Sequence, residues 1–450
     1  MLRYYLKLGL LSIKSNWALS SLMVSAIAIG IGACMTIVTV RHVMADNPIE
    51  HKNDRLFHVQ LDNWNPNDPY EEPNEPPEQV TYLDATALLE AGRAQRQVVS
   101  FKTDRVVQPD GEDVLPFQEE VRATSANFFA MFDVPFRYGS GWDAAADRAE
   151  ERVVVLSSVM NEQLFGGEDS TGRMLMMNNE PFRIVGVLDE WHPVPTFYDL
   201  NNNPFAGPEE IYTPFSLAVS GEWGSSGNNS CWKPPEEGGY EGYLASECIW
   251  IQMWVELPDQ ADKDAYLQFL NDYVTEQKAL GRFPRELNNR LSTPAEWMVN
   301  REVVDDTVGV LLSLAVLFLI VCLLNTIGLL LAKVIRRSGD ISLRRALGAS
   351  KAELFKQYII EASMIGVAGG IAGIGMTWLG LRGIENVFAD YDFIEHLVTM
   401  DWKMVGLAVV LAIASALGAA LYPTWRACRV SPASTCLLYT SDAADDEYRG

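Results

Sequence analysis

Positive charge is scarce in this sequence. Its 450 residues contain 35 Lys and Arg against 59 Asp and Glu, which gives a formal net charge of -24. Because nucleic-acid binding depends on basic side chains that neutralise phosphates, we expect no DNA or RNA partner. An acidic surface favours cationic substrates or partners, although solvation alone also explains it.

Residues typical of catalytic and metal sites are also few. The five His residues show no paired ligand spacing, and neither an HExxH nor a GxSxG motif occurs. The stretch "GEDSTGR" at 167–173 has the glycine spacing of a phosphate-binding loop, but Arg173 stands where Lys is required. We therefore expect no catalytic residue, no metal site and no bound cofactor, so that any ATP-driven step would belong to another chain.

Long apolar stretches distinguish this sequence from that of an ordinary soluble protein. A helix needs about 20 predominantly apolar residues to cross a bilayer. Four stretches reach this length, at residues 17–40, 308–334, 358–381 and 404–422. We predict four transmembrane helices. The first is preceded by basic residues, as in a signal peptide, but it is too long and lacks a convincing cleavage site, which favours a retained anchor.

The distribution of basic residues predicts the orientation of these helices, because cytoplasmic loops carry an excess of Lys and Arg. Residues 333–356, between the second and third helices, contain seven Lys or Arg and two acids. In contrast, residues 45–306 contain 19 Lys or Arg and 47 Asp or Glu. We therefore expect both termini and the basic loop to be cytoplasmic and the large acidic segment to be outside.

The external segment has the patterns of a mixed α+β domain. Runs rich in β-branched and aromatic residues at 152–158 and 249–257 predict strands. The stretch "RMLMMNNEPFRIVGV" predicts a β-hairpin that turns at Asn178 and Asn179. Residues 201–247 are rich in Asn, Gly, Ser and Pro, so we interpret them as a surface insertion or lid.

Two cysteines lie in this external segment, Cys231 and Cys248. Disulfides persist outside the cytoplasm, so the pair is a candidate disulfide. The spacing permits closure of a loop but does not define the geometry that a disulfide requires. We therefore leave both the bridged and the free state open for these cysteines.

The predicted fold class is an α-helical membrane protein with four transmembrane helices and a large α+β extracytoplasmic domain between helices 1 and 2. No helix breaker follows Pro294, so we expect a helix that continues unbroken into the second apolar stretch as a stalk. The expected order of parts is a cytoplasmic N-terminus (1–16), helix 1 with its stalk (17–44), the external domain (45–295), a stalk with helix 2 (296–334), the basic cytoplasmic segment (335–357), helix 3 (358–381), an external loop (382–403), helix 4 (404–422) and a cytoplasmic tail (423–450).

Two motifs point to a known family. In the external domain, "VVVLSSVMNEQLFGGEDSTGRMLMMNNEPFRIVGV" combines an "LFG" helix end, a Gly-basic pair and a strand ending in "IVGV". In the basic loop, "RRSGDISLRRALGASKAELFKQYIIEA" leads into a helix that opens with Glu. Together with the order of parts, they resemble the MacB-type and FtsX-like permease family of ABC transporters. The loop departs from the family pattern "R..EIGLRRALGA" at Asp340 and Ser342.

This resemblance implies a non-catalytic permease subunit in the bacterial inner membrane, with a MacB-like periplasmic core domain. The basic loop would dock on a separate cytoplasmic ABC ATP-binding subunit that uses ATP and Mg, and would transmit its motion to the periplasmic domain for efflux of a peptide, drug or lipid-linked substrate. From charge alone, contact with anionic lipid explains the loop as well. The implied ATPase-coupling residues are Arg336, Arg337, Asp340, Leu343, Arg344, Arg345, Leu347 and Gly348.

The resemblance leaves partners and task open. The permease would act as a homodimer or as a heterodimer with a related permease, and a periplasmic adaptor is a further candidate partner. An alternative function is that of an FtsX-like signalling protein that regulates a periplasmic partner such as a cell-wall hydrolase, without transport. The sequence departs from the family after Ser434, so we expect the last dozen or so residues to be unrelated to it.

The third apolar stretch contains glycines that allow two helix backbones to approach closely. Gly366 and Gly370, and also Gly369 and Gly373, are four residues apart. They suit either a face that slides against a second subunit or ordinary packing within one subunit. Glu361, near the start of this stretch, is expected to pair with an arginine of the basic loop rather than to carry protons.

Overall fold

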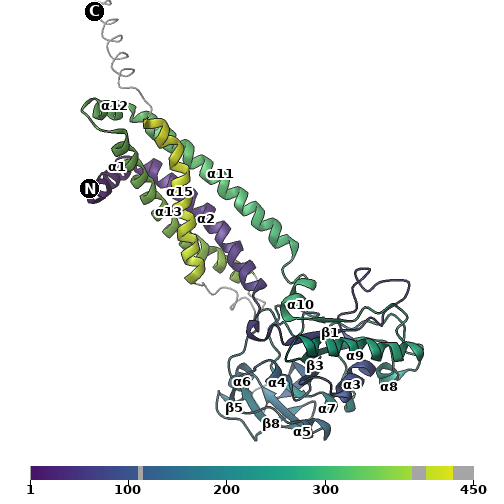
Figure 1. The fold of residues 1–450 in the computed structure, drawn as a ribbon. Helices are drawn as coiled ribbons and strands as arrows, with labels where there is room; N and C mark the ends of the chain where they lie inside the picture. The colour runs from purple at the N-terminus through teal and green to yellow at the C-terminus, as the bar shows by residue number, and fades with distance from the viewer. Residues whose placement is uncertain (1, 110–114, 388–401, 429–450) are drawn as a thin grey trace, which may run out of the picture. The chain divides into compact units, whose positions relative to one another are not determined.

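The computed structural model describes residues 2–109, 115–387 and 402–428 (Figure 1). The chain divides into two compact units. The external unit comprises Met44–Val304, and the membrane unit comprises Met1–Val43 together with Asp305–Gly450. Most of the expected external loop at 382–403, and the end of the tail with its departure after Ser434, lie outside the described residues.

A mixed β-sheet of eleven strands, counted over the described residues, forms the centre of the external unit. Its order is β11-β1-β10-β3-β4-β9-β6-β8-β5, with β2 beside β10 and β7 beside β3 and β8. The strands are β1 Leu56–Gln60, β2 Val80–Thr81, β3 Arg96–Gln108, β4 Phe117–Thr124, β5 Phe136–Gly139, β6 Val153–Leu156, β7 Met174–Met177, β8 Glu180–Leu188, β9 Ile211–Pro214, β10 Ile249–Glu256 and β11 Arg290–Ser292.

Helices pack around this sheet, and all but α9 are short, which confirms the predicted α+β class of the external domain. They are η1 Glu50–Lys52, α3 Tyr82–Ala91, α4 Phe128–Met131, α5 Ala144–Arg148, α6 Ser158–Phe165, α7 Phe215–Ser220, α8 Gly239–Leu244, α9 Gln260–Ala279 and α10 Pro294–Asn300. Alternate residues of β10 enter different apolar clusters: Met253 and Val255 belong to one and Trp254 to the other. Because successive side chains of a strand point to opposite faces, the sheet has a core on each face.

Local turn chemistry explains the hairpin that the sequence predicts. Strands β7 and β8 are antiparallel, with Met177 opposite Glu180. The two intervening residues, Asn178 and Asn179, have φ angles of 47° and 67°. Asn tolerates this left-handed conformation better than most residues, and a two-residue turn of this kind matches the twist of the strands. The predicted hairpin is confirmed.

The interpretation of residues 201–247 as a surface insertion or lid is wrong in part. This segment contains β9, which lies inside the sheet, parallel to β4 and antiparallel to β6. All four residues of β9 are buried. The strand is short, follows turn-forming residues and leads directly into α7, so its pattern does not stand out in the sequence.

The stalk before the second apolar stretch is not one continuous helix. Helix α10 ends at Asn300, and α11 begins at Asp306. Between them Glu302 has a φ angle of 47°, which ends the helical conformation. The side chain of Asp305 then accepts a hydrogen bond from the backbone N–H of Thr307 at 2.5 Å, so it caps the start of α11.

The membrane unit consists of helices, all of them long except α1 and α12. They are α1 Leu2–Ser15, α2 Trp17–Ala45, α11 Asp306–Arg336, α12 Ser338–Ala346, α13 Lys351–Val387 and α15 Trp402–Cys428. Within the described residues, three helical segments are long and apolar enough to cross a membrane: Trp17–Lys52, Asp306–Arg336 and Lys351–Glu385. Helix α15 contains a shorter apolar segment, Ile413–Tyr422, where the fourth span is expected.

Candidate functional site

The basic loop forms a short helix, α12, between α11 and α13. Ile341 in its first turn is 3% exposed and belongs to a small apolar cluster with Val334 of α11 and Leu354 of α13. Arg344 Nη1 also donates a hydrogen bond to Gln357 Oε1 at 3.2 Å. These contacts attach α12 to the ends of both neighbouring helices.

Two leucines of this segment point away from the apolar cluster. Leu343 is 62% exposed and Leu347 is 81% exposed. Because residues four apart on a helix lie on the same side, the two side chains form one exposed ridge. Of the other residues implied in coupling, Arg336, Asp340, Arg344 and Gly348 are exposed, whereas Arg337 and Arg345 are half-buried.

A glycine stop and a capping box define the sharp turn between α12 and α13. Gly348 has a φ angle of 100°, and the N–H of Ala349 donates to the carbonyl oxygen of Arg344 at 3.0 Å, as at many helix ends. Ser350 Oγ accepts from the backbone N–H of Glu353, whose carboxylate accepts from the N–H of Ser350. The motif "LGASKAE" therefore holds α12 at a defined position beside α13.

A buried ion pair joins the last turn of α11 to the first half of α13. Lys333 Nζ donates to Glu361 Oε1, and both side chains are nearly inaccessible. Ser12 Oγ of α1 donates to the same carboxylate oxygen at 2.5 Å, and Arg337 Nη1 donates to Ser12 Oγ at 2.6 Å. Three helices therefore meet at one carboxylate.

The expectation that Glu361 pairs directly with a loop arginine is wrong. Its ionic partner is Lys333, and Arg337 is linked to it through Ser12. Sequence reasoning missed Lys333 and Ser12 as parts of this site. A signal was present, since Lys333 and Glu361 are opposite charges at the end of the second apolar stretch and the start of the third, and such charges pair to avoid being isolated in lipid.

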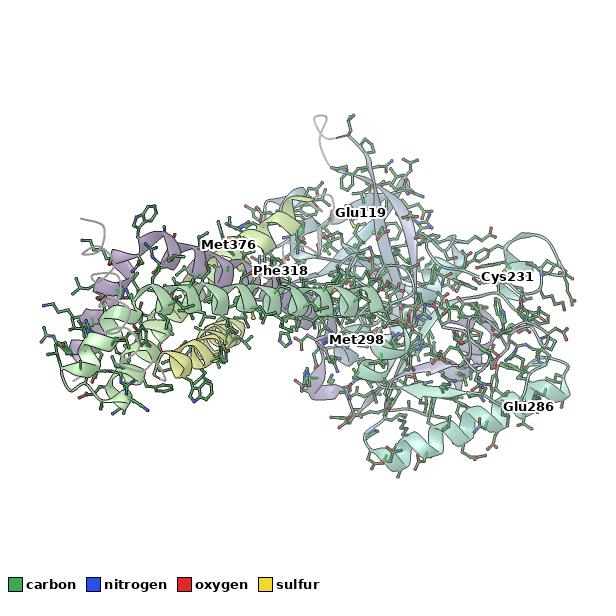
Figure 2. The ribbon with its side chains drawn as sticks, turned by 90° about the horizontal axis from the view of Figure 1, so that it is seen from above. Glu119, Cys231, Glu286, Met298, Phe318 and Met376 are labelled. Atoms are coloured by element: carbon green, nitrogen blue, oxygen red, sulfur yellow. A yellow bond between two sulfur atoms is a disulfide. The ribbon has the colours of Figure 1, made fainter. Side chains whose placement is uncertain are left out.

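Glycines bring α2 and α13 close together within the membrane unit. A Cβ atom added to Gly369 would lie 2.7 Å from Ile27 Cγ2, and one added to Gly373 would lie 3.2 Å from Ile31 Cγ2. The contact is reciprocal, because a Cβ on Gly32 would lie 2.5 Å from the Cβ of Met376. Met376 is labelled in Figure 2. Along this contact the residue numbers of both helices increase in the same direction, so α2 and α13 run parallel. The other glycines of the pattern, Gly366 and Gly370, are buried as well.

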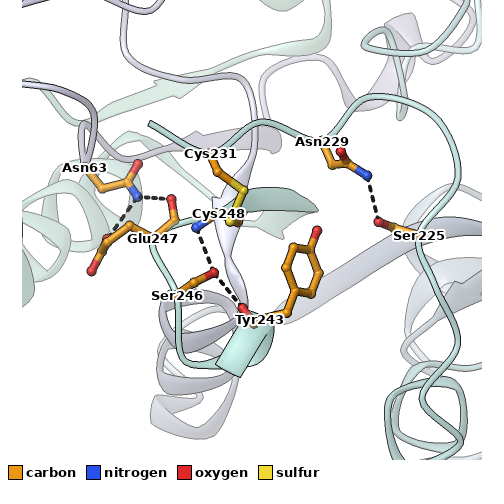
Figure 3. The surroundings of a disulfide bond; sticks show 8 residues. All are labelled: Asn63, Ser225, Asn229, Cys231, Tyr243, Ser246, Glu247 and Cys248. Atoms are coloured by element: carbon orange, nitrogen blue, oxygen red, sulfur yellow. Dashed lines mark hydrogen bonds between the residues drawn. A yellow bond between two sulfur atoms is a disulfide. The ribbon is translucent and has the colours of Figure 1, made fainter. Parts of the chain in front are cut away.

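In the external unit, Cys231 and Cys248 form a disulfide, with their Cα atoms 4.2 Å apart (Figure 3). Cys248 directly precedes β10, and its backbone N–H donates to Ser246 Oγ at 3.2 Å. The bridge closes the loop that carries α8, so it ties this loop to the start of a buried central strand.

A buried charge cluster lies beneath the same sheet. Arg122 of β4 donates to Asp199 at 2.6 Å and also contacts Glu209, while Gln252 donates to Asp199 at 3.1 Å. Burial lowers the pKa of Arg122, but Glu209 and Asp199 outweigh it, so this pKa lies well above its ordinary value. We regard the cluster as structural. Among the described residues, no group of three or more His, Cys, Asp or Glu could hold a metal ion.

Comparison with known proteins assigns both units to families. Residues 20–272 match the MacB-like periplasmic core domain, and residues 312–432 match the FtsX-like permease C-terminal domain. The macrolide export ATP-binding/permease protein MacB of Neisseria meningitidis serogroup A is 22% identical over 316 residues, which cover 68% of this chain and 41% of that protein. The pyoverdine export ATP-binding/permease protein PvdT of Pseudomonas savastanoi is 25% identical over 261 residues, 56% of this chain and 34% of that protein.

The chain thus spans less than half the length of these two curated relatives. Among solved structures, the periplasmic region of MacB from Actinobacillus actinomycetemcomitans is similar, with a TM-score of 0.36 and 12% identity over 58% of this chain and 99% of that one. The extracellular domain of YknZ from Gram-positive bacteria has a TM-score of 0.33 and 14% identity, over 53% of this chain and all of that one. Because the core-domain match alone covers more than half of the chain, the protein belongs to the family of ABC transporter permeases with a MacB-like periplasmic core domain and an FtsX-like permease domain.

Proposed function

We propose that this chain couples ATP hydrolysis by a separate cytoplasmic ATPase to movement of its external unit. In this mechanism the partner binds ATP and Mg, and the permease chain contributes no catalysis. The observation that carries the proposal is the ridge of Leu343 and Leu347, which is exposed on a helix that is itself attached through Ile341. An apolar ridge of this kind fits a groove on a partner, and the arginines beside it suit an acidic rim.

The contacts of α12 explain how docking would be transmitted. Ile341 packs on Val334 and Leu354, so α12 contacts both α11 and α13. Arg337, which precedes α12, reaches α1 through Ser12. A displacement of α12 by the ATPase would therefore act on three helices together, because closely packed elements move as units rather than deform.

The membrane topology is part of the same proposal. Four helices would cross the inner membrane at 17–40, 308–334, 358–381 and 404–422, with the termini and segment 335–357 in the cytoplasm and residues 45–295 in the periplasm. The parallel course of α2 and α13 supports this, because the first and third crossings must run in the same direction. The subunit would pair with a second copy or a related permease, and a periplasmic adaptor would complete the path.

The relatives suggest the kind of task. Two of them are named for macrolide export and pyoverdine export, so we propose efflux or extraction of a drug, peptide or lipid-linked substrate. Regulation of a periplasmic enzyme without transport would use the same topology. It would replace our proposal if deletion of this chain left efflux unchanged while a cell-wall hydrolase was captured by the external unit.

The proposal is tested by changing Leu347 to Asp and purifying the protein with its ATPase. A charge at the ridge should prevent burial in the partner groove, so we expect loss of the complex or at least a tenfold fall in transport-coupled ATPase activity. Leu280→Asp is the matched control, since Leu280 is 73% exposed in the external unit. Unaltered complex formation and activity in Leu347→Asp would overturn the proposal.

A further inference from the structure

A cavity of about 630 Å³ opens on the external unit. Its walls come from α3, the end of α5, α7 and α8, which lie near one another in Figure 1. The floor is apolar: Phe215, Val219 and Leu244 are buried there, and Tyr82 stacks over Phe215 with ring centroids 6.3 Å apart. Small-molecule sites have this size and this apolar lining.

The rim of the cavity is negatively charged. Four exposed glutamates line it against a single arginine: Glu90, Glu150, Glu222, Glu241 and Arg148. In the part of the chain that the structure describes, none of these four glutamates takes part in a salt bridge. Their charge therefore remains available to a ligand, and low-dielectric walls concentrate the field between them.

Burial and the rim carboxylates raise the pKa of two tyrosine hydroxyl groups in the cavity. Burial raises the pKa of Tyr82, and Glu241, Glu90 and Glu150 raise it further. Burial also raises the pKa of Tyr240 to about 12, with Glu222 and Glu241 among the charges that add to it. The carboxylates thus act on the inside of the cavity as well as on the surrounding solvent.

We propose that this cavity binds an organic cation with an apolar body. The rings of Tyr82, Phe215 and Tyr240 would contact the apolar body and attract its positive charge through their faces. The rim carboxylates would neutralise the cation, and an anion of the same shape would be repelled. The site lies wholly in the external unit and does not depend on docking of an ATPase, so it goes beyond the proposed function.

Backbone conformation offers a way to remove the charge without harming the fold. Glu150 and Glu222 have φ angles of 52° and 53°, in the left-handed region where Asn is better tolerated than Glu. Changing both to Asn removes two rim carboxylates while the backbone keeps its conformation. Glu302 has a φ angle of 47° and lies outside the cavity lining, so Glu302→Asn is a matched control.

The test uses the full chain in detergent and isothermal titration with tetraphenylphosphonium, an apolar cation. Tetraphenylborate, an anion of similar shape, is the control ligand. We expect saturable binding of the cation, no comparable binding of the anion, and at least a tenfold weaker affinity in the Glu150→Asn, Glu222→Asn double variant. The unfolding temperature of this variant should be unchanged or higher, and Glu302→Asn should bind as the unaltered chain does.

Several outcomes would overturn the inference. Equal binding of the anion, absence of cation binding, or unchanged affinity in the double variant would each do so. Binding of a basic peptide in place of the phosphonium, lost in the same variant, would mark the cavity as a protein-docking surface instead. Leu347→Asp should leave phosphonium binding intact, so failure of ATPase coupling and failure of this site are distinguishable.

Discussion

All eight residues of β10 in the external unit are buried, whereas only 11% of the most apolar stretch of α11 in the membrane unit is buried. Both segments are strongly apolar. In water, apolar side chains are removed from solvent by other side chains. In a bilayer the lipid itself is an apolar solvent, so side chains of α11 such as Phe318 stay on the outside (Figure 2).

The two units also differ in how they hold their elements together. The external unit has two apolar clusters and a buried cluster of charges around Arg122. The membrane unit relies on close backbone approach at Gly369 and Gly373 and on the pair between Lys333 and Glu361. Exposure of an apolar side chain therefore indicates a partner surface only where water is the solvent, as our proposal requires for Leu347.

The largest effect is expected from Arg122→Ala in the external unit. The change leaves Asp199 and Glu209 buried without their cation, which should lower the free energy of unfolding by about 3–5 kcal/mol. Urea denaturation of the full chain in detergent, followed by tryptophan fluorescence, measures it. Arg152→Ala is the control, because its pair with Glu180 is about half exposed and should be worth less than about 1 kcal/mol. Equal losses of unfolding free energy in both variants would show that burial does not determine how much these ion pairs contribute to stability.

An intermediate effect is expected from Gly373→Val in the membrane unit. The added side chain would press on Ile31, and overpacking of this kind lowers the free energy of unfolding by about 1–3 kcal/mol. Gly375→Val is matched in helix propensity, but a Cβ at Gly375 meets nothing within 4 Å. Unfolding by titration with a denaturing detergent should separate the two variants. If they unfold alike, close approach of α2 and α13 contributes nothing measurable.

The smallest effect, measured per pH unit, concerns Glu78 in the external unit. Burial raises the pKa of Glu78 from 4.5 to about 7, although Arg301 acts against this rise. Between pH 4.5 and 7 the folded chain holds a proton that the unfolded chain has lost, so the free energy of unfolding falls as pH rises. The slope is at most about 1.4 kcal/mol per pH unit.

Glu78→Gln should remove this slope. Burial lowers the pKa of His58 to about 3, which destabilises the fold toward acid and acts in the opposite direction. The quantity to compare is therefore the difference between the unaltered chain and Glu78→Gln, measured by urea denaturation at several pH values. A constant difference from pH 4.5 to 7 would contradict the raised pKa of Glu78.

Local chemistry made several elements predictable. The turn at Asn178 and Asn179 depends on two adjacent residues that accept a left-handed backbone, and the end of α6 depends on Gly166, with a φ angle of 63°. In these cases the deciding interactions lie within a few residues. Strand β9 was not predictable in this way, because its four residues are identified by their distant neighbours β4 and β6.

The candidate site shows the same limit. The pattern of α12 indicates an amphipathic basic helix, yet only packing decides that Ile341 is buried and Leu343 and Leu347 are exposed. The cavity of the external unit is lined by residues from four helices between positions 82 and 245, and no local sequence pattern predicts it.

Composition and order along the chain by themselves determined the apolar stretches, the division into an acidic and an apolar part, and the local turns, because solvent preference and backbone freedom are properties of single residues and close neighbours. Tertiary structure alone decided the partner of Glu361, the break between α10 and α11, the central place of β9 and the acidic cavity. Each of these features depends on which residues, distant in the sequence, come into contact in the folded chain. The energies of burial and of charge pairing arise from those contacts and cannot be read from any one segment.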